Sequence, residues 1–307
     1  MTDIARLAAQ ARDGNQRALG RLMSIVERGG DGVRELALHM APKAGGAKVV
    51  GLTGSPGVGK STTTNALVAE YRKQGQRVAV LAVDPSSPFS GGAILGDRIR
   101  MQDHALDSGV YIRSMSSRGH LGGLAAATPQ AVRVLEACGF DIVLIETVGV
   151  GQAEVSIAAL ADTTLVLLAP GMGDGIQAVK AGILEVADAF VINKADRDGA
   201  DATFRDIRSM MSLITREPNA WRQPIVKTVA HRDEGIGDVI DAVAKHHAWL
   251  AEHGELERQR TLRAESEVSA IVLGALAKRF AVTDALASRV AAGELDPYTA
   301  ADEVLSG

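Results

Sequence analysis

Seven short apolar segments recur along the middle of the chain, separated by polar or glycine-rich segments. Their near-continuous valine, isoleucine and leucine content is typical of strands buried on both faces of a sheet. The predicted strands are residues 49–53, 78–83, 110–114, 142–146, 164–169, 189–193 and 225–228. Helical patterns lie between most of them, at residues 61–74, 129–137, 155–161, 175–185 and 202–214. This alternation predicts an α/β fold with a doubly wound, mostly parallel sheet flanked by helices.

Both ends of the chain carry helical patterns without strands. Residues 3–41 predict two or three short helices, which end at a breaker segment over 42–46. After Gly237 the predicted helices are residues 239–250, 256–279 and 284–292. The apolar stripe in the second half of segment 255–280 either packs on the chain's own sheet or joins two copies of the chain. We therefore expect an N-terminal helical segment (1–45), a nucleotide-binding domain (46–252) and a C-terminal helical extension (253–307).

Composition narrows the classes of partner. The 307 residues carry a net charge of −4 and only 3% aromatic side chains, with no basic block, which argues against a nucleic-acid partner. No apolar run reaches membrane-spanning length and no signal-peptide pattern opens the chain, so we expect a cytoplasmic protein without a membrane partner. The single cysteine, Cys138, excludes an intramolecular disulfide and is expected to be a small buried hydrophobe.

Residues 54–61 match the P-loop pattern G-x-x-x-x-G-K-[ST] between a predicted strand and a predicted helix. The glycines let backbone N–H groups converge on phosphate oxygens, and the start of the helix adds its positive dipole end. Lys60 is expected to reach the β- and γ-phosphates, and the Ser61 hydroxyl to ligate Mg²⁺. The predicted phosphate-binding residues are Gly54, Ser55, Pro56, Gly57, Val58, Gly59, Lys60, Ser61 and Thr62.

A second motif indicates the base. Asn193, Lys194 and Asp196 form an N-K-x-D pattern at the end of a predicted strand. The Asp196 carboxylate can accept hydrogen bonds from the ring N–H and the exocyclic amino group of guanine, a donor pair that adenine lacks. The Lys194 stem can lie over the base. Backbone N–H groups after the next strand are expected to meet the base oxygen, in the segment Thr228, Val229 and Ala230.

Three carboxylates are candidates for a magnesium shell at the carboxyl edge of the sheet. Glu146 ends an apolar strand in the Walker B arrangement, where Ras-like proteins have aspartate. Asp84 follows another strand, and Asp97 lies in a glycine-rich run that is a candidate switch I; helix capping is the alternative for both. Hard oxygen ligands of this kind suit Mg²⁺.

Several residues are candidates for assisting hydrolysis. Gly149 is placed for its amide to sense the γ-phosphate, and Gln152 is the candidate for orienting the attacking water, with a polar surface position as the alternative. Arginines that could approach the phosphates or a partner are Arg98, Arg113 and Arg118. An arginine supplied by a partner is also possible, so slow intrinsic turnover is expected.

Five segments together resemble the MeaB/ArgK family of GTPases, a branch of the SIMIBI class of P-loop proteins that includes the methylmalonic aciduria type A protein. They are residues 54–61, 83–88, 96–101, 146–152 and 193–196, and the resemblance extends over nearly the whole chain. It implies a GTPase chaperone for an adenosylcobalamin-dependent acyl-CoA mutase, above all methylmalonyl-CoA mutase. Such a chaperone gates cofactor delivery and protects the mutase, and is typically a homodimer through its C-terminal helices.

The resemblance also implies roles for particular residues. Lys60 and Ser61 would handle phosphate and Mg²⁺, while Asp84, Asp97 and Glu146 would form the acidic magnesium and switch shell. Residues 149–154 would be switch II, and residues 171–180 would be switch III, which couples to the mutase. Without the resemblance, 171–180 is an ordinary glycine-rich connection.

Other function classes fit the sequence less well. A metal-insertion GTPase needs histidine or cysteine clusters, whereas the seven histidines are scattered and the pair His246 and His247 is expected on a helix surface. An ATP-dependent kinase or ligase is opposed by the guanine-type motif at 193–196. Older descriptions link the family to lysine/arginine/ornithine transport, but the sequence gives no independent support for protein kinase activity. An interaction module that uses the helical tail is compatible with the GTPase hypothesis.

Overall fold

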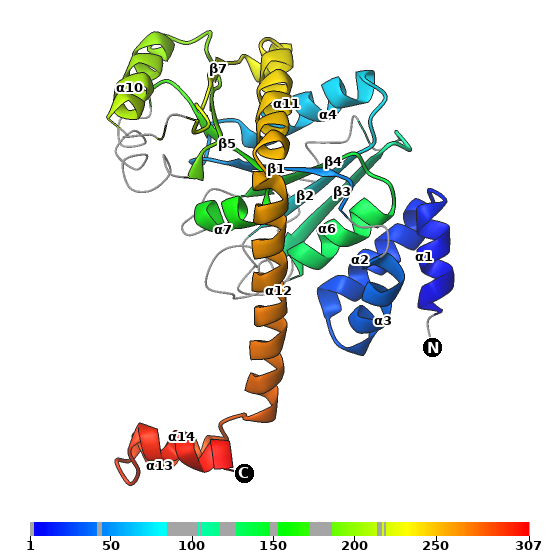
Figure 1. The fold of residues 1–307 in the computed structure, drawn as a ribbon, viewed down its shortest axis with the longest axis vertical. Helices are drawn as coiled ribbons and strands as arrows, with labels where there is room; N and C mark the ends of the chain where they lie inside the picture. The colour runs from blue at the N-terminus through cyan, green and yellow to red at the C-terminus, as the bar shows by residue number, and fades with distance from the viewer. Residues whose placement is uncertain are drawn as a thin grey trace. The chain divides into compact units, whose positions relative to one another are not determined.

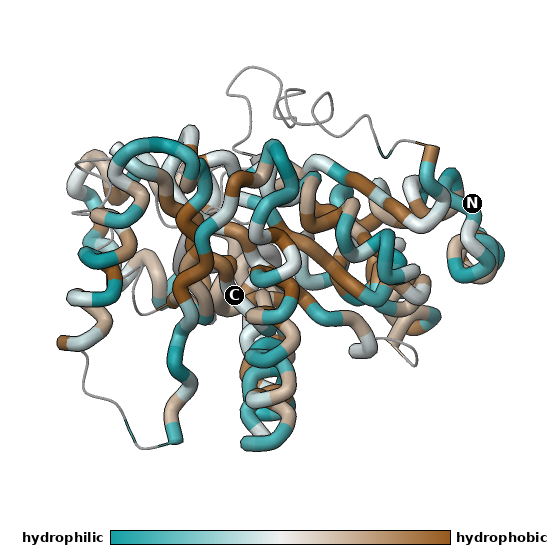
Figure 2. Tube along the Cα trace, turned by 90° about the horizontal axis from the view of Figure 1, so that it is seen from above, coloured by the Kyte–Doolittle hydropathy of each residue, from teal (hydrophilic) through white to brown (hydrophobic). Residues whose placement is uncertain are grey.

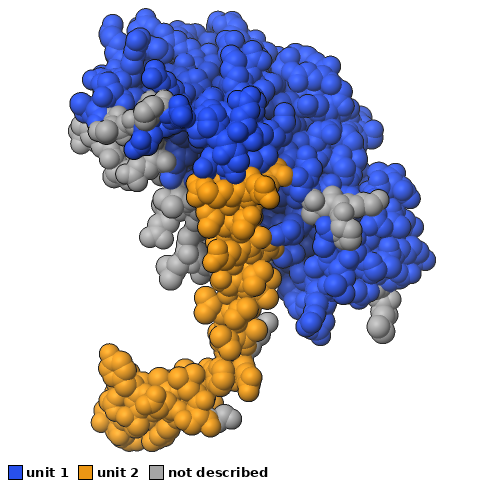
Figure 3. All heavy atoms as spheres, in the orientation of Figure 1, with its two compact units in different colours: residues 1–256 blue, residues 257–307 orange. Residues whose placement is uncertain are grey.

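The computed structural model describes residues 3–41, 45–84, 104, 106–116, 127–147, 153–171, 186–213, 217 and 219–306. The chain divides into two compact units, Met1–Leu256 and Glu257–Gly307, which Figure 3 distinguishes by colour. The N-terminal helices belong to the same unit as the sheet, and the division into three domains stays a prediction. None of the described helices is both long and apolar enough to cross a bilayer.

Among the described residues, seven parallel strands form one sheet in the order β3-β2-β4-β1-β5-β6-β7 (Figure 1). They are β1 (Lys48–Thr53), β2 (Val78–Asp84), β3 (Val110–Ser116), β4 (Ile142–Thr147), β5 (Thr163–Leu168), β6 (Ala189–Ile192) and β7 (Ile225–Lys227). All seven predicted strands are confirmed, with small shifts of their ends. Because β2, β3 and β4 lie on one side of β1 and β5, β6 and β7 on the other, β1 stands where the strand order reverses. The carboxyl end of a strand at this switch point is where open α/β sheets bind ligands.

Helices cover both faces of the sheet (Figures 1 and 2). Helices α4 (Lys60–Lys73) and α11 (Ile236–Glu252) bury side chains in the cluster that contains Val50, whereas α6 (Thr128–Ala137) and α7 (Ala153–Leu160) pack in the cluster that contains Val49. Successive strand residues point to opposite faces, so neighbouring valines of β1 reach separate cores. Helix α10 (Ala200–Ser212) contributes Ile207 to a third cluster. Predicted helix 175–185 lies outside the described residues.

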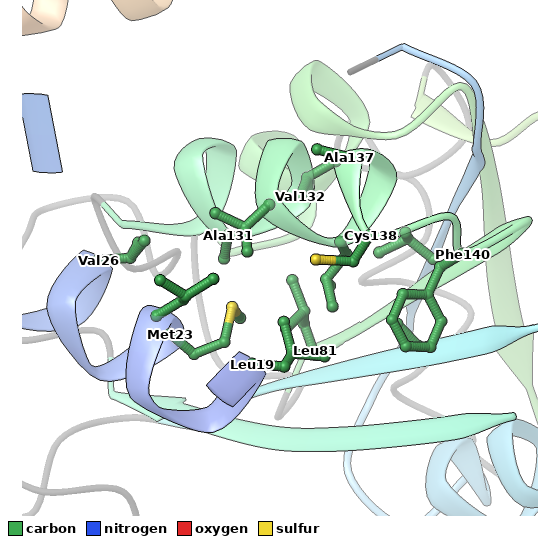
Figure 4. Close-up of a cluster of buried hydrophobic side chains, with 14 of the residues drawn as sticks. Leu19, Met23, Val26, Leu81, Ala131, Val132, Ala137, Cys138 and Phe140 are labelled. Atoms are coloured by element: carbon green, nitrogen blue, oxygen red, sulfur yellow. The ribbon is translucent and has the colours of Figure 1, made fainter. Parts of the chain in front are cut away.

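The N-terminal segment forms three helices, within the predicted two or three: α1 (Ile4–Arg12), α2 (Gln16–Arg28) and α3 (Asp31–Met40). Figure 4 shows how α2 joins the core of the sheet. Its buried residues Leu19, Met23 and Val26 share a cluster with Leu81 of β2 and with Ala131 and Val132 of α6.

Cys138 is buried in the same cluster as these helices, which confirms its expected role as a small hydrophobe. Burial raises the pKa of its thiol to about 11, so the reactive thiolate is disfavoured at neutral pH. The side chain contributes to packing.

The second unit contains most of α12 (Glu255–Arg279), with α13 (Asp284–Ala291) and α14 (Pro297–Ser306). Helix α14, which begins at Pro297, was not among the predicted helices. Proline is well suited to the first turn of a helix, where its missing N–H is not needed. The Asp296 carboxylate accepts hydrogen bonds from the N–H groups of Tyr298 (2.9 Å) and Thr299 (3.1 Å), which starts the helix.

The expected surface position of His246 is wrong. This side chain is 2% exposed and lies on α11 in line with the buried Val239, Val243 and Leu250. Its Nδ1 atom is 2.9 Å from Thr163 Oγ1, and its Nε2 atom is 3.4 Å from Asp188 Oδ1, at the amino ends of β5 and β6.

Burial shifts the pKa values of this pair in opposite directions. It raises the pKa of Asp188 to about 7 against one opposing hydrogen bond from the Thr164 N–H. It lowers the pKa of His246 to about 4, an effect to which His247 adds and which Asp162 opposes. Burial therefore favours the neutral form of each group in the folded chain, whereas in the unfolded chain the imidazole is the more basic of the two groups.

Replacing Asp188 by asparagine should make stability sensitive to acid. Between pH 4 and 6.5 the wild-type pair binds one proton both folded and unfolded, so it adds little pH dependence. In Asp188→Asn only the lowered pKa of His246 contributes to the pH dependence. Its contribution to the free energy of unfolding is fully present above about pH 6.5 and is lost as the pH falls toward 4. We expect the variant to lose about 2 kcal/mol more than the wild type between pH 7 and 5 in urea denaturation. The same pH dependence in both proteins would contradict this assignment.

Candidate active site

The predicted P-loop connects β1 to α4 and depends on two glycines that accept no side chain. Gly54 has φ 137°, and a Cβ atom there would lie 2.3 Å from the Leu167 carbonyl oxygen. Gly59 has φ 97°, and a Cβ atom there would lie 2.3 Å from the Asn193 amide nitrogen. The loop is thus shaped by close approach to β5 on one side and to the end of β6 on the other.

Lys60, the first residue of α4, turns back into the loop. It is 7% exposed, and its Nζ donates to the carbonyl oxygens of Gly54 (2.7 Å) and Ser55 (3.1 Å). Pro56 and Gly57 are exposed, and the helix N-cap, Gly59, has no side chain to cap the first turn. An ammonium group and a helix N-terminus at one turn suit an anion such as a phosphate.

The remaining residues predicted for this loop differ in exposure. Val58 is buried beneath the loop, whereas Thr62 is exposed on the first turn of α4. The contacts expected of Thr62 with a nucleotide stay a prediction.

Glu146 lies beside the start of α4, as the Walker B hypothesis requires. In register it pairs with Leu52 of β1 and Ala82 of β2, and it is 4% exposed. Ser61 Oγ donates to Glu146 Oε1 at 2.6 Å, and Thr64 Oγ1 lies 2.9 Å from Oε2. A serine hydroxyl and a carboxylate are hard oxygen donors, so this pair fits Mg²⁺.

Thr64 was not predicted. It stands three residues after Ser61, and helix residues at that spacing share a face, which is the signal that could have found it.

Several predicted site residues lie wholly or partly outside the described residues. Asp84 ends β2 at the carboxyl edge of the sheet, just past the pairing of Val83 with Thr147, but its side chain lies outside the described residues. The same holds for the whole of Asp97, Gly149 and Gln152, for Arg98 and Arg118, and for 172–180 of predicted switch III. The roles of these residues stay predictions.

Arg113, a candidate for approaching the phosphates or a partner, pairs with a carboxylate of the N-terminal helices. Its guanidinium pairs with Glu27 of α2, with Nε donating to Oε1 at 2.9 Å. This ion pair raises the pKa of the arginine and joins β3 to the N-terminal helices. The residue therefore supports the fold.

Asn193 ties three loops together on the base side of the site. Its Nδ2 donates to the Val58 carbonyl oxygen at 2.9 Å, and its Oδ1 accepts from Thr228 Oγ1 (3.2 Å) and the Ala230 N–H (3.1 Å). Lys194 has φ 58° and donates from Nζ to the Gly57 carbonyl oxygen at 2.7 Å. Direct hydrogen bonds from Asn193 and Lys194 therefore join the N-K-x-D motif to the P-loop.

The segment 228–230 is buried and follows β7, but its N–H groups have partners within the protein. Those of Thr228, Val229 and Ala230 donate to Ile192 O, Glu234 O and Asn193 Oδ1, respectively. A contact with the base oxygen stays a prediction, and it requires one of these hydrogen bonds to be shared.

Asp196 faces a cation that the sequence did not indicate. Its side chain is 29% exposed, and Arg232 Nη2 lies 3.7 Å from Oδ2. The Ala195 N–H donates to the Thr228 carbonyl oxygen at 3.0 Å, which holds the motif against the segment 228–230. A partly open carboxylate at the end of β6 is accessible to a planar donor pair.

Comparison with known proteins places this site in a family. A profile described as methylmalonyl-CoA mutase-associated GTPase MeaB matches residues 19–285. The chain belongs to the MeaB family. It is 45% identical over 310 residues to a Pyrococcus abyssi protein described as a GTPase, covering 98% of this chain and 96% of that one. It is 36% identical to GTPase ArgK of Escherichia coli, covering 84% and 80% of the two chains.

Two further comparisons agree with this result. The mouse methylmalonic aciduria type A homolog is 41% identical over 214 residues, which are 69% of this chain and 52% of that protein. A crystal structure of a LAO/AO transport system kinase superposes with a TM-score of 0.75 at 25% identity, covering 100% of this chain and 98% of the other. The resemblance inferred from the motifs is thus confirmed.

Proposed function

We propose that this MeaB-family GTPase is a Mg²⁺-dependent switch that chaperones an adenosylcobalamin-dependent acyl-CoA mutase, with methylmalonyl-CoA mutase as the expected client. The match of most of the chain to a family described as mutase-associated carries the proposal. In this role GTP binding and hydrolysis gate cofactor delivery and protect the mutase from inactivation.

The phosphate side of the site supports hydrolysis through charge and position. Lys60 places a cation inside the P-loop, and α4 directs its N-terminus at the same point. Ser61 and Glu146 would hold Mg²⁺, which when bound neutralises charge on the phosphates. In this proposal Asp84 and Asp97 complete the acidic shell, Gly149 senses the γ-phosphate and Gln152 orients the attacking water.

The base side of the site supports selection of GTP and GDP. Asn193 fixes the loop that carries Asp196, and the carboxylate is open enough to accept from guanine. Adenine offers no matching pair of donors, so an ATP complex would leave the carboxylate without its partners. This argument disfavours an ATP-dependent kinase.

The C-terminal helices support assembly into a homodimer. Helix α12 exposes Val268, Ile271, Val272, Leu273 and Leu276, and the spacing of all but Leu273 puts them along one side of the helix. Exposed apolar stripes of this kind mark surfaces that bind other proteins. We propose that a second copy of the chain covers them.

Turnover measurements test the switch. The purified chain is assayed with GTP and with ATP, alone and with an adenosylcobalamin-dependent acyl-CoA mutase; serum albumin at the same concentration is the control. We expect slow hydrolysis that is faster with GTP than with ATP, and a rate that rises when the mutase is added but not when albumin is added. In light scattering we expect the chain to have the mass of a dimer. If the mutase does not change the rate of GTP hydrolysis, the proposed client is wrong. If the chain hydrolyses ATP faster than GTP, the proposed guanine site is wrong.

Two alternatives receive less support. The name LAO/AO transport system kinase applies to the structural relative that carries it, and no contact among the described residues of this chain points to transport. Within the described part of the chain, no group of three histidine, cysteine, aspartate or glutamate side chains is arranged to hold a metal ion, so a metal-insertion role gains no support there.

A further inference from the structure

Two hydroxyl groups on one face of α4 hold the two oxygens of Glu146 separately. Ser61 donates to Oε1 at 2.6 Å, and Thr64 lies 2.9 Å from Oε2. Thr64 is 0% exposed and Glu146 is 4% exposed, so water does not readily replace the contact between them. Helix α4 therefore helps to orient the carboxylate through one hydroxyl at each oxygen.

The Thr64 hydroxyl has a choice of acceptors. Its Oγ1 also lies 3.0 Å from the Lys60 carbonyl oxygen, which is the local back-bond that threonines commonly make in helices. A hydroxyl has one proton, and a hydrogen bond to an ionised carboxylate is roughly twice as strong as one to a neutral carbonyl. We therefore expect the Thr64 hydroxyl to donate to Glu146.

The neighbouring Thr63 shows what a purely structural threonine does on this helix. It is also 0% exposed, and its Oγ1 donates to the Gly59 carbonyl oxygen at 3.0 Å. Its hydroxyl proton is thus used in the back-bond, whereas that of Thr64 is used on the carboxylate. The two side chains are a matched pair that differs in the contact with Glu146.

Glutamate needs such a second support. Rotation about its last side-chain bond has a broad, shallow energy profile, so a single hydrogen bond leaves the carboxylate plane loosely defined. A bond at each oxygen fixes that plane. If Ser61 serves as a metal ligand, Thr64 still holds the far oxygen.

We propose that Thr64 is a positioning residue that orients Glu146 for the magnesium site. The inference rests on the proposed site at Ser61 and Glu146. Groups that orient a metal ligand change metal affinity by about 10- to 100-fold when removed, so loss of the hydroxyl should weaken Mg²⁺ binding without removing the site.

The test follows release of a fluorescent GDP analogue over a range of Mg²⁺ concentrations, with EDTA as the metal-free reference. Thr64→Val removes the hydroxyl and keeps the shape, Thr64→Ser keeps the hydroxyl, and Thr63→Val is the matched control. In Thr64→Val we expect the Mg²⁺ concentration for half-maximal slowing of release to rise about tenfold, with the EDTA rate unchanged. Thr64→Ser and Thr63→Val should behave as the wild type.

The outcomes test the role of Thr64 separately from the proposed metal site at Ser61 and Glu146. If Mg²⁺ does not slow release from the wild type, the proposed metal site is wrong. If the wild type responds and Thr64→Val responds identically, the role of Thr64 is wrong. Faster release from Thr64→Val in EDTA as well, or an equal shift in Thr63→Val, would also overturn it, because packing would then explain the effect. Thr64→Ala removes the hydroxyl by a second substitution if the valine variant does not fold.

Discussion

Replacing Lys60 by methionine is expected to lower kcat for GTP hydrolysis by about 10²- to 10³-fold. The size is that of removing one fixed electrostatic donor from a site where charge develops in the transition state. Methionine keeps an unbranched stem of similar length but removes the ammonium, which Gly54 and Ser55 hold inside the P-loop. Single-turnover hydrolysis, with the protein in excess over the nucleotide, measures this step separately from product release.

Lys73 provides the matched control for this substitution. It lies at the other end of the same helix, is exposed, and pairs with Glu70 at 2.8 Å. Lys73→Met should hydrolyse GTP at the wild-type rate, and both variants should keep the wild-type circular dichroism spectrum. A Lys60→Met protein that retains more than about a tenth of the wild-type kcat would place the essential cation elsewhere.

Most of the sheet could be predicted because its strands are covered on both faces. Runs such as that of β4 are buried at every position, and an apolar run of this length bounded by turn residues has few other structures available. The nucleotide-binding motifs could be predicted because each sequence pattern directly follows a predicted strand. Ser61 and Glu146, both predicted for the magnesium site, are in contact in the structure. Register explains this, since Glu146 pairs with the end of β1 directly before the P-loop.

The missed features depend on contacts between distant segments. Asp188 and His246 are each unremarkable in the sequence, and only the packing of α11 on β5 brings the imidazole to the carboxylate. Arg232 meets Asp196 because the chain after β7 returns to the end of β6. Thr64 is different, because its helix spacing from Ser61 was visible. A pattern search that stops at the motif boundary does not reach the next turn of the helix.

Replacing Asp196 by asparagine should change which base the protein binds. An aspartate carboxylate accepts hydrogen bonds from both the ring N–H and the amino group of guanine. In asparagine an NH₂ group replaces one of the two carboxylate oxygens, so two donors would face each other at the guanine amino group. We expect affinity for GDP to fall by about 100-fold, which is the cost of a pair of lost or opposed hydrogen bonds at a partly buried site. Titration with a fluorescent GDP analogue measures this loss.

Xanthine nucleotides make the prediction specific. Xanthine has a carbonyl oxygen where guanine has its amino group, so the asparagine amide can donate to that oxygen while its own oxygen accepts from the ring N–H. Asp196→Asn should therefore bind XDP more tightly than GDP, the reverse of the wild-type order. The control is Asp198→Asn on the same exposed turn, which should keep the preference for GDP. If Asp196→Asn weakens GDP and XDP equally, the carboxylate acts through Arg232 and the local fold, because direct recognition of the base requires the two affinities to move in opposite directions.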